Sequence, residues 1–97
     1  MHVIFQGLRK SKATSTATEY IVTLRIDGKL RRFHALVSAD EIGAVSFRES
    51  AINSLLAYNM NSDQGRMVYK SIAQLHSEHR KPTLPMDLGN WSQRRAC

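Results

Sequence analysis

The dipeptide Asp27-Gly28 constrains the fold more than any other feature, because it separates two runs of residues that favour β-strands. Both central residues of a two-residue type I′ turn need positive φ angles, and Asp-Gly adopts them readily. Residues 20–37 are therefore predicted to form a β-hairpin. The turn also sets the register, and the expected cross-strand pairs are Ile26–Lys29, Arg25–Leu30, Leu24–Arg31, Thr23–Arg32, Val22–Phe33, Ile21–His34, Tyr20–Ala35 and Glu19–Leu36.

This register gives the hairpin two different faces. The face with Val22, Leu24 and Phe33 is apolar except near the turn, so we expect it to pack on helices. The opposite face, with Arg25 and Arg32, is mixed and basic, as in the solvated side of an antiparallel sheet. Before the hairpin, residues 3–8 are predicted to form a first strand. Residues 11–18, a Ser, Thr, Ala and Lys run without apolar periodicity, are predicted to form a loop.

Two helices are predicted after the hairpin. Ser38 and Glu41 have the spacing of a capping box, and a second Ser-x-x-Glu at Ser46 to Glu49 indicates a helix that restarts at Phe47. Its expected core face consists of Ile52, Leu55 and Leu56, with Ala51 and Met60 beside them.

The second helix has a suitable N-cap in Ser62. Val68, Ile72 and Leu75 then recur at helical spacing. Pro82 must end this helix at or before Lys81, because proline disfavours helical geometry in the preceding residue. The chain is thus predicted to be an α+β protein with a three-stranded antiparallel sheet packed on two helices. Residues 1–81 form the single domain, and residues 82–97 form an irregular C-terminal tail.

Composition narrows the class of protein further. The 97 residues suffice for one domain and carry a net charge of +6. Residues 1–38 hold seven bases and two acids and residues 64–97 six bases and two acids, whereas residues 39–63 hold one base and four acids. The only cysteine is Cys97, and no apolar run is long enough for a membrane span or a secretory signal. We therefore expect a basic cytoplasmic protein without disulfides and without membrane contact.

Nothing in the sequence indicates catalysis. Asp27 belongs to a turn, Asp40 and Glu41 to a helix start and Asp63 to a first helical turn, so no carboxylate keeps an evident partner for acid–base chemistry. The sequence has neither a Gly-x-Ser-x-Gly elbow nor a glycine-rich phosphate loop. The prediction is a protein that is not an enzyme and has no cofactor.

A metal site is not predicted either. His76 and His79 share a helix face, but zinc sites normally use three or four protein ligands and no further Cys or His lies nearby in the sequence. Cations near a helix C-terminus, where the helix dipole favours them, are the simpler interpretation.

Two segments are candidate contacts for a macromolecule. On the hairpin, Arg25, Arg31 and Arg32 fit a basic ribbon that contacts DNA or an acidic protein, although a merely solvated face would have the same composition. In the tail, prolines alternate with large apolar side chains, and the candidate contacts are Pro82, Leu84, Pro85, Met86 and Trp91. These residues are predicted either to dock on a partner or to cover the core of this domain.

The chain resembles the small anti-RecBCD accessory proteins of lambdoid Salmonella phages. The resemblance rests on length, on the basic balance, and on a helical stretch at residues 62–80 followed by the proline-bearing tail. It implies a non-enzymatic modulator that binds the host RecBCD helicase–nuclease on its RecC side and favours phage recombination. It also implies a host prolyl isomerase as a second partner, with Pro82 and Pro85 as the candidate sites. A small DNA-binding domain that uses the basic hairpin is the alternative.

Overall fold

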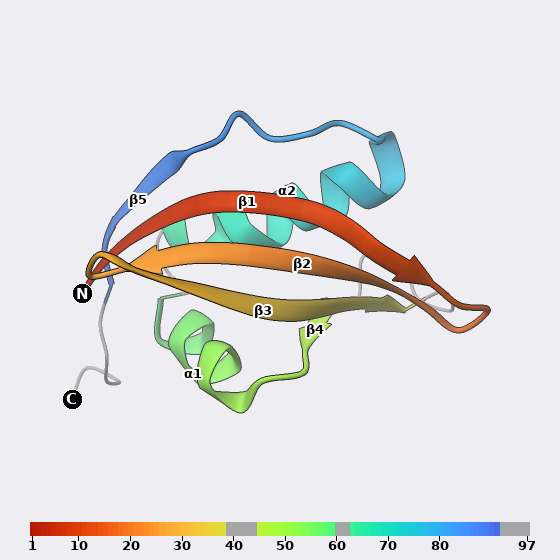
Figure 1. Cartoon of the computed structure of the whole chain (residues 1–97), viewed down its shortest axis with the longest axis horizontal. Coiled ribbons are helices and arrows are strands. Elements are labelled where there is room, and N and C mark those ends of the chain that lie inside the picture. Colours follow the sequence, from red (N-terminus) through yellow and green to blue (C-terminus); the bar gives the residue numbers. More distant parts are fainter. Residues whose placement is uncertain (39–44, 60–62, 92–97) are drawn as a thin grey trace.

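A computed structural model describes residues 1–38, 45–59 and 63–91 of the chain. Within these ranges the elements are β1 (His2–Ala13), β2 (Ala17–Ile26), β3 (Lys29–Ser38), β4 (Val45–Phe47), α1 (Ser50–Asn59), α2 (Asp63–Glu78) and β5 (Met86–Asn90). The strands form one sheet in the order β4-β3-β2-β1-β5, and all neighbours are antiparallel. In Figure 1 the three long strands curve together across the molecule, and α2 lies behind them.

The predicted hairpin is confirmed in every cross-strand pair. β2 and β3 pair from Ile26–Lys29 to Ala17–Ser38 without a register shift. Asp27 and Gly28 have φ angles of 49° and 83°, as the type I′ turn requires. This agreement follows from a local cause, because a two-residue turn leaves the two strands a single way to align.

The predicted number of strands was wrong, since the sheet has five strands and not about three. The first strand extends to Ala13, and the predicted loop at residues 11–18 shrinks to a short turn. There the Thr14 amide donates to the Ala17 carbonyl (2.8 Å), and the Thr14 hydroxyl accepts from the Ala17 amide (3.1 Å). Residues 9–16 are exposed on both sides of the strand pair, so no alternation of apolar and polar residues marks them as strands.

The start of the first helix was also misplaced. Residues 45–47 form β4, which pairs with residues 35–37 of β3, and α1 begins only at Ser50. Glu49 does not act as a helix cap here, because its carboxylate accepts a hydrogen bond from the amide of His34. The predicted capping box at Ser38 to Glu41, and the predicted positions of Met60 and Ser62, extend outside the described residues.

The core faces of both helices are confirmed except at Ala51, which is exposed and not part of the core. Ile52 and Leu56 of α1 and Val68 and Ile72 of α2 are buried, with Leu55 and Leu75 partly buried beside them. α2 ends at Glu78, before Pro82 as expected. No helix among the described residues is long and apolar enough to cross a membrane.

The irregular tail is the third correction. Residues 86–90 form β5, an edge strand that pairs with β1. Leu88 and Trp91 are buried, and the Trp91 amide donates to the Met1 carbonyl (2.7 Å). The pairing joins residues more than 80 positions apart, and a five-residue strand containing Gly89 at a φ of 75° has no local signature. The Leu84–Pro85 peptide bond is cis.

Candidate functional site

The side of the sheet that faces away from the helices is the candidate site. Strand alternation places Val22, Leu24, Phe33 and Ala35 inside, where they are buried. Their neighbours in sequence point to the other side, which we call the outer face. Its residues on β2 and β3 are Glu19, Ile21, Thr23, Arg25, Leu30, Arg32, His34 and Leu36. All of them except Glu19 are half-buried or exposed, so the outer face is open over most of its area.

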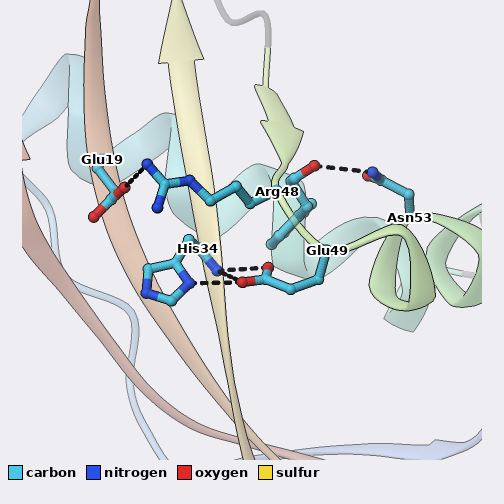
Figure 2. Close-up of polar contacts among 6 residues, drawn as sticks. Glu19, His34, Arg48, Glu49 and Asn53 are labelled. Carbon is cyan, nitrogen blue, oxygen red and sulfur yellow. Dashed lines mark hydrogen bonds and ion pairs between the residues drawn. The ribbon is translucent and has the colours of Figure 1, made fainter.

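On one half of the outer face, the polar groups are paired with residues that follow β4 (Figure 2). Glu49 lies beside His34, with 2.6 Å between its Oε1 and the ring Nδ1 and 2.9 Å between its Oε2 and the backbone nitrogen. Partial burial raises the pKa of Glu49, but the hydrogen bonds from His34 outweigh it and leave the pKa below its usual value. The carboxylate therefore accepts the hydrogen bond of a β3 amide that lies beyond the end of β4.

Arg48 crosses β3 to reach Glu19 on β2. Its Nη2 lies 3.2 Å from the Glu19 Oε2, an ion pair whose geometry does not make a hydrogen bond. The Glu19 side chain is only 7% exposed, whereas that of Arg48 is 56% exposed. The Arg48 amide also donates to the His34 carbonyl (2.9 Å), which fixes the chain at this point. A buried carboxylate needs such a partner, so this arginine has a structural role.

The other half of the outer face, nearer the Asp27-Gly28 turn, is not neutralised. Arg25 and Arg32 are diagonal neighbours across β2 and β3, because Arg25 lies opposite Leu30 and Arg32 opposite Thr23. Arg25 donates only to the Gly28 carbonyl (3.1 Å), and no ion pair engages Arg32 in the ranges that the structure describes. We call Arg25, Leu30 and Arg32, with the neighbouring Thr23 and Ile21 of β2, the arginine patch.

Leu30 makes this patch unusual. It is 58% exposed and is the large hydrophobic residue that stands out on the described surface. Two acids at this end of the sheet have other partners: Asp27 accepts from the His2 amide (2.9 Å), and Asp87 lies 2.9 Å from the His2 ring. Positive charge beside an exposed apolar side chain is the composition of a contact surface for an acidic macromolecule.

Arg31 does not join the other two hairpin arginines. It lies on the inner face near the turn, with its guanidinium carbon 5.7 Å from the centre of the Phe33 ring. There it borders a groove of about 190 Å³ between the hairpin and Leu55 of α1. The structure therefore divides the three predicted arginines between two faces.

The predicted contacts in the tail are used differently. Trp91 is 3% exposed, and its indole nitrogen donates to the Leu88 carbonyl (3.0 Å). Leu84 and Met86 are half-buried against the core, Pro82 is half-buried and Pro85 is exposed. The apolar side chains of this segment thus cover the core of the domain itself, which is the second of the two interpretations.

Sequence reasoning missed the pairs that close half of the outer face. Arg48 and Glu19 are 29 positions apart, and no local pattern connects them.

For metals, no group of three or more possible ligands occurs among residues 1–38, 45–59 and 63–91. Comparisons of the chain with protein-family models, with curated proteins and with solved structures give no match.

Proposed function

We propose that this protein is a non-enzymatic binding protein whose arginine patch contacts an acidic macromolecule. The observation that carries the proposal is the pair Arg25 and Arg32, which lie together on an open sheet face without an acidic partner among the described residues. Two guanidinium groups on an open face can bind carboxylates or phosphates that a partner supplies. Leu30 between them adds apolar area to the same contact.

The first partner to test follows from the resemblance to phage anti-RecBCD proteins. We propose that the chain is a phage-encoded modulator that binds host RecBCD, on its RecC side, and so favours phage recombination. A host prolyl isomerase is a second proposed partner. The exposed Pro85 and the half-buried Pro82 lie in the stretch between α2 and β5, where an enzyme could approach them.

Direct DNA binding is the alternative that the same arginines support. A two-stranded ribbon with basic side chains suits a major groove. The arginine patch contains no aromatic side chain, so stacking on single-stranded bases is not supported. The alternative therefore predicts binding to duplex DNA that is dominated by phosphate contacts.

A binding experiment with purified RecBCD and with duplex DNA separates these functions. The variant Arg25→Glu/Arg32→Glu reverses the charge of the patch, and Lys29→Glu/Arg31→Glu, which makes the same change of charge on the inner face, is the matched control. We expect immobilised wild-type protein and the control to retain RecBCD and the double variant to lose it. Absence of RecBCD retention by the wild type would rule out the modulator function.

The DNA arm uses a mobility shift at several salt concentrations. Direct DNA binding predicts affinity that falls steeply with salt, and the loss of two phosphate contacts would lower the slope of log K against log salt by about 2. No shift at low salt rules out the alternative. A shift that the double variant leaves unchanged shows that DNA contacts another surface.

A further inference from the structure

A basic cavity lies at the opposite end of the molecule from the arginine patch. It is bordered by the far ends of β1 and β2 and by the end of α2, on the right-hand side of Figure 1. Its volume is about 340 Å³, larger than the groove beside Arg31 and within the size range of small-molecule sites. Leu8 of β1 and Leu75 of α2 supply apolar walls.

The charged side chains that border the cavity are all basic. Arg9 and Lys10 come from β1, and Lys81 comes from the segment after α2. Neither Lys10 nor Lys81 forms an ion pair with any residue in the described part of the chain. Glu19 and Glu78 are next to lining residues in the sequence, but neither of them borders the cavity. Like charges held together without a counter-ion favour the binding of an anion.

The dipole of α2 disfavours an anion at this end of the helix, and its size can be compared with that of the surrounding positive charges. A helix C-terminus is equivalent to about half a negative charge. Two of its carbonyls are already used, since Leu75 accepts from the His79 amide (3.1 Å) and Gln74 from the Arg80 amide (3.4 Å). The two full positive charges of Lys10 and Lys81 therefore outweigh the dipole.

A hydrogen bond joins Tyr20 and His76, which both border the cavity. The Tyr20 hydroxyl lies 3.0 Å from the His76 Nδ1, and the two rings meet edge to face. Burial raises the pKa of Tyr20, so the phenol keeps its proton at neutral pH. When Tyr20 donates to Nδ1, the ring proton of neutral His76 resides on Nε2. His79 borders the same cavity one helical turn later.

We propose that this cavity binds a small phosphate monoester, with the phosphate held by Lys10, Lys81 and His76. A monoester carries nearly two negative charges at neutral pH and three strong acceptor oxygens, which matches several donors from different elements. Leu8 and Leu75 then contact the organic part of the ligand. The cavity and the arginine patch are separate surfaces, so this site does not depend on RecBCD or DNA binding.

Titration of the full chain followed by NMR and calorimetry tests the proposal, with AMP, inorganic phosphate and adenosine as probes. We expect saturable binding of AMP, weaker binding of phosphate and none of adenosine, with the largest shifts at His76, His79 and Lys10. Equal binding of adenosine and AMP, or no binding of AMP and phosphate at low salt, would overturn the proposal.

Matched variants locate the site. Lys10→Gln/Lys81→Gln is expected to weaken AMP binding at least tenfold, whereas Lys29→Gln/Lys70→Gln removes the same charge from exposed positions elsewhere and should change it less than twofold. Tyr20→Phe keeps the ring and removes the hydrogen bond to His76, with an expected weakening of about threefold. An equal loss in both lysine pairs would show a general charge effect and contradict a site. Arg25→Glu/Arg32→Glu should leave AMP binding intact.

Discussion

The C-terminal segment from Pro82 to Trp91 and the outer face of the hairpin are both predicted from the sequence as contact surfaces. The fold places them differently. In the segment, Trp91 and Leu88 are buried beneath the sheet they help to complete. On the hairpin, Arg25 and Arg32 point away from the core, and neither has an acidic partner in the part of the chain that the structure describes. Large apolar side chains can be buried within their own domain, whereas the charge of an arginine is neutralised only by an opposite charge. Unpaired charge is thus the better marker of a contact surface.

The sharpest test of this comparison is Trp91→Ala. Removal of a buried indole should lower the free energy of unfolding by about 3–5 kcal/mol, which denaturant titration measures directly. Thr83→Ala, at an exposed position of the same segment, is the control and should stay within about 0.5 kcal/mol of the wild type. Loss of partner binding without loss of stability in Trp91→Ala would break the comparison, because the tail would then be a contact surface.

Arg48→Met tests whether the ion pair between Arg48 and Glu19 on the outer face stabilises the fold. The substitution leaves the buried Glu19 carboxylate without its partner, and the expected loss is about 2 kcal/mol, between the values for exposed and buried pairs. The variant Arg48→Met/Glu19→Gln should recover part of this loss, because no buried charge then remains. Equal losses in the single and double variants would show that the ion pair does not contribute.

Glu49→Gln should have a smaller, pH-dependent effect. The pKa of Glu49 is lower in the folded state, so its carboxylate stabilises the fold above its unfolded pKa of about 4.5. This contribution is lost as the pH falls through the lower folded pKa. We expect the variant to be less stable by up to about 1 kcal/mol at pH 7 and the difference to vanish once the pH is below the lowered pKa of the folded state. Chemical denaturation across this range measures it, and a difference that grows at acidic pH would contradict the assignment.

Arg32→Gln should have the smallest effect on stability. Since Arg32 has no partner among the described residues, the expected change is within about 0.5 kcal/mol. The affinity for the acidic partner should fall at the same time, as RecBCD retention or a mobility shift measures. A loss of stability comparable to that of Arg48→Met would show that Arg32 is structural and would weaken the proposed patch.

Local elements of the fold were predictable, and elements that depend on distant partners were not. The hairpin register and the buried faces of α1 and α2 follow from patterns within 20 residues. β4 and β5 are three and five residues long, and each is a strand only because β3 or β1 lies alongside. The exposed end of β1 has no alternation to detect, since neither of its faces is buried.

The candidate site shows the same division. Its positive charge could be predicted, and the hairpin register placed Arg25 and Arg32 on one face and Arg31 on the other. The neutralising residues could not be predicted, because Arg48 and Glu49 reach the outer face from a connection whose path depends on β4. The basic cavity was missed for a similar reason, since Lys10, His76 and Lys81 come from three separate segments.

By itself the sequence determined the basic charge, the Asp27-Gly28 hairpin and the apolar faces of two helices. These depend on backbone geometry and on the periodicity of neighbouring residues, which act over short distances. Only the tertiary structure decided that the C-terminal segment completes the sheet and which arginines keep their charge unpaired. Those outcomes depend on which distant groups meet in space, and burial and ion pairing are set only there.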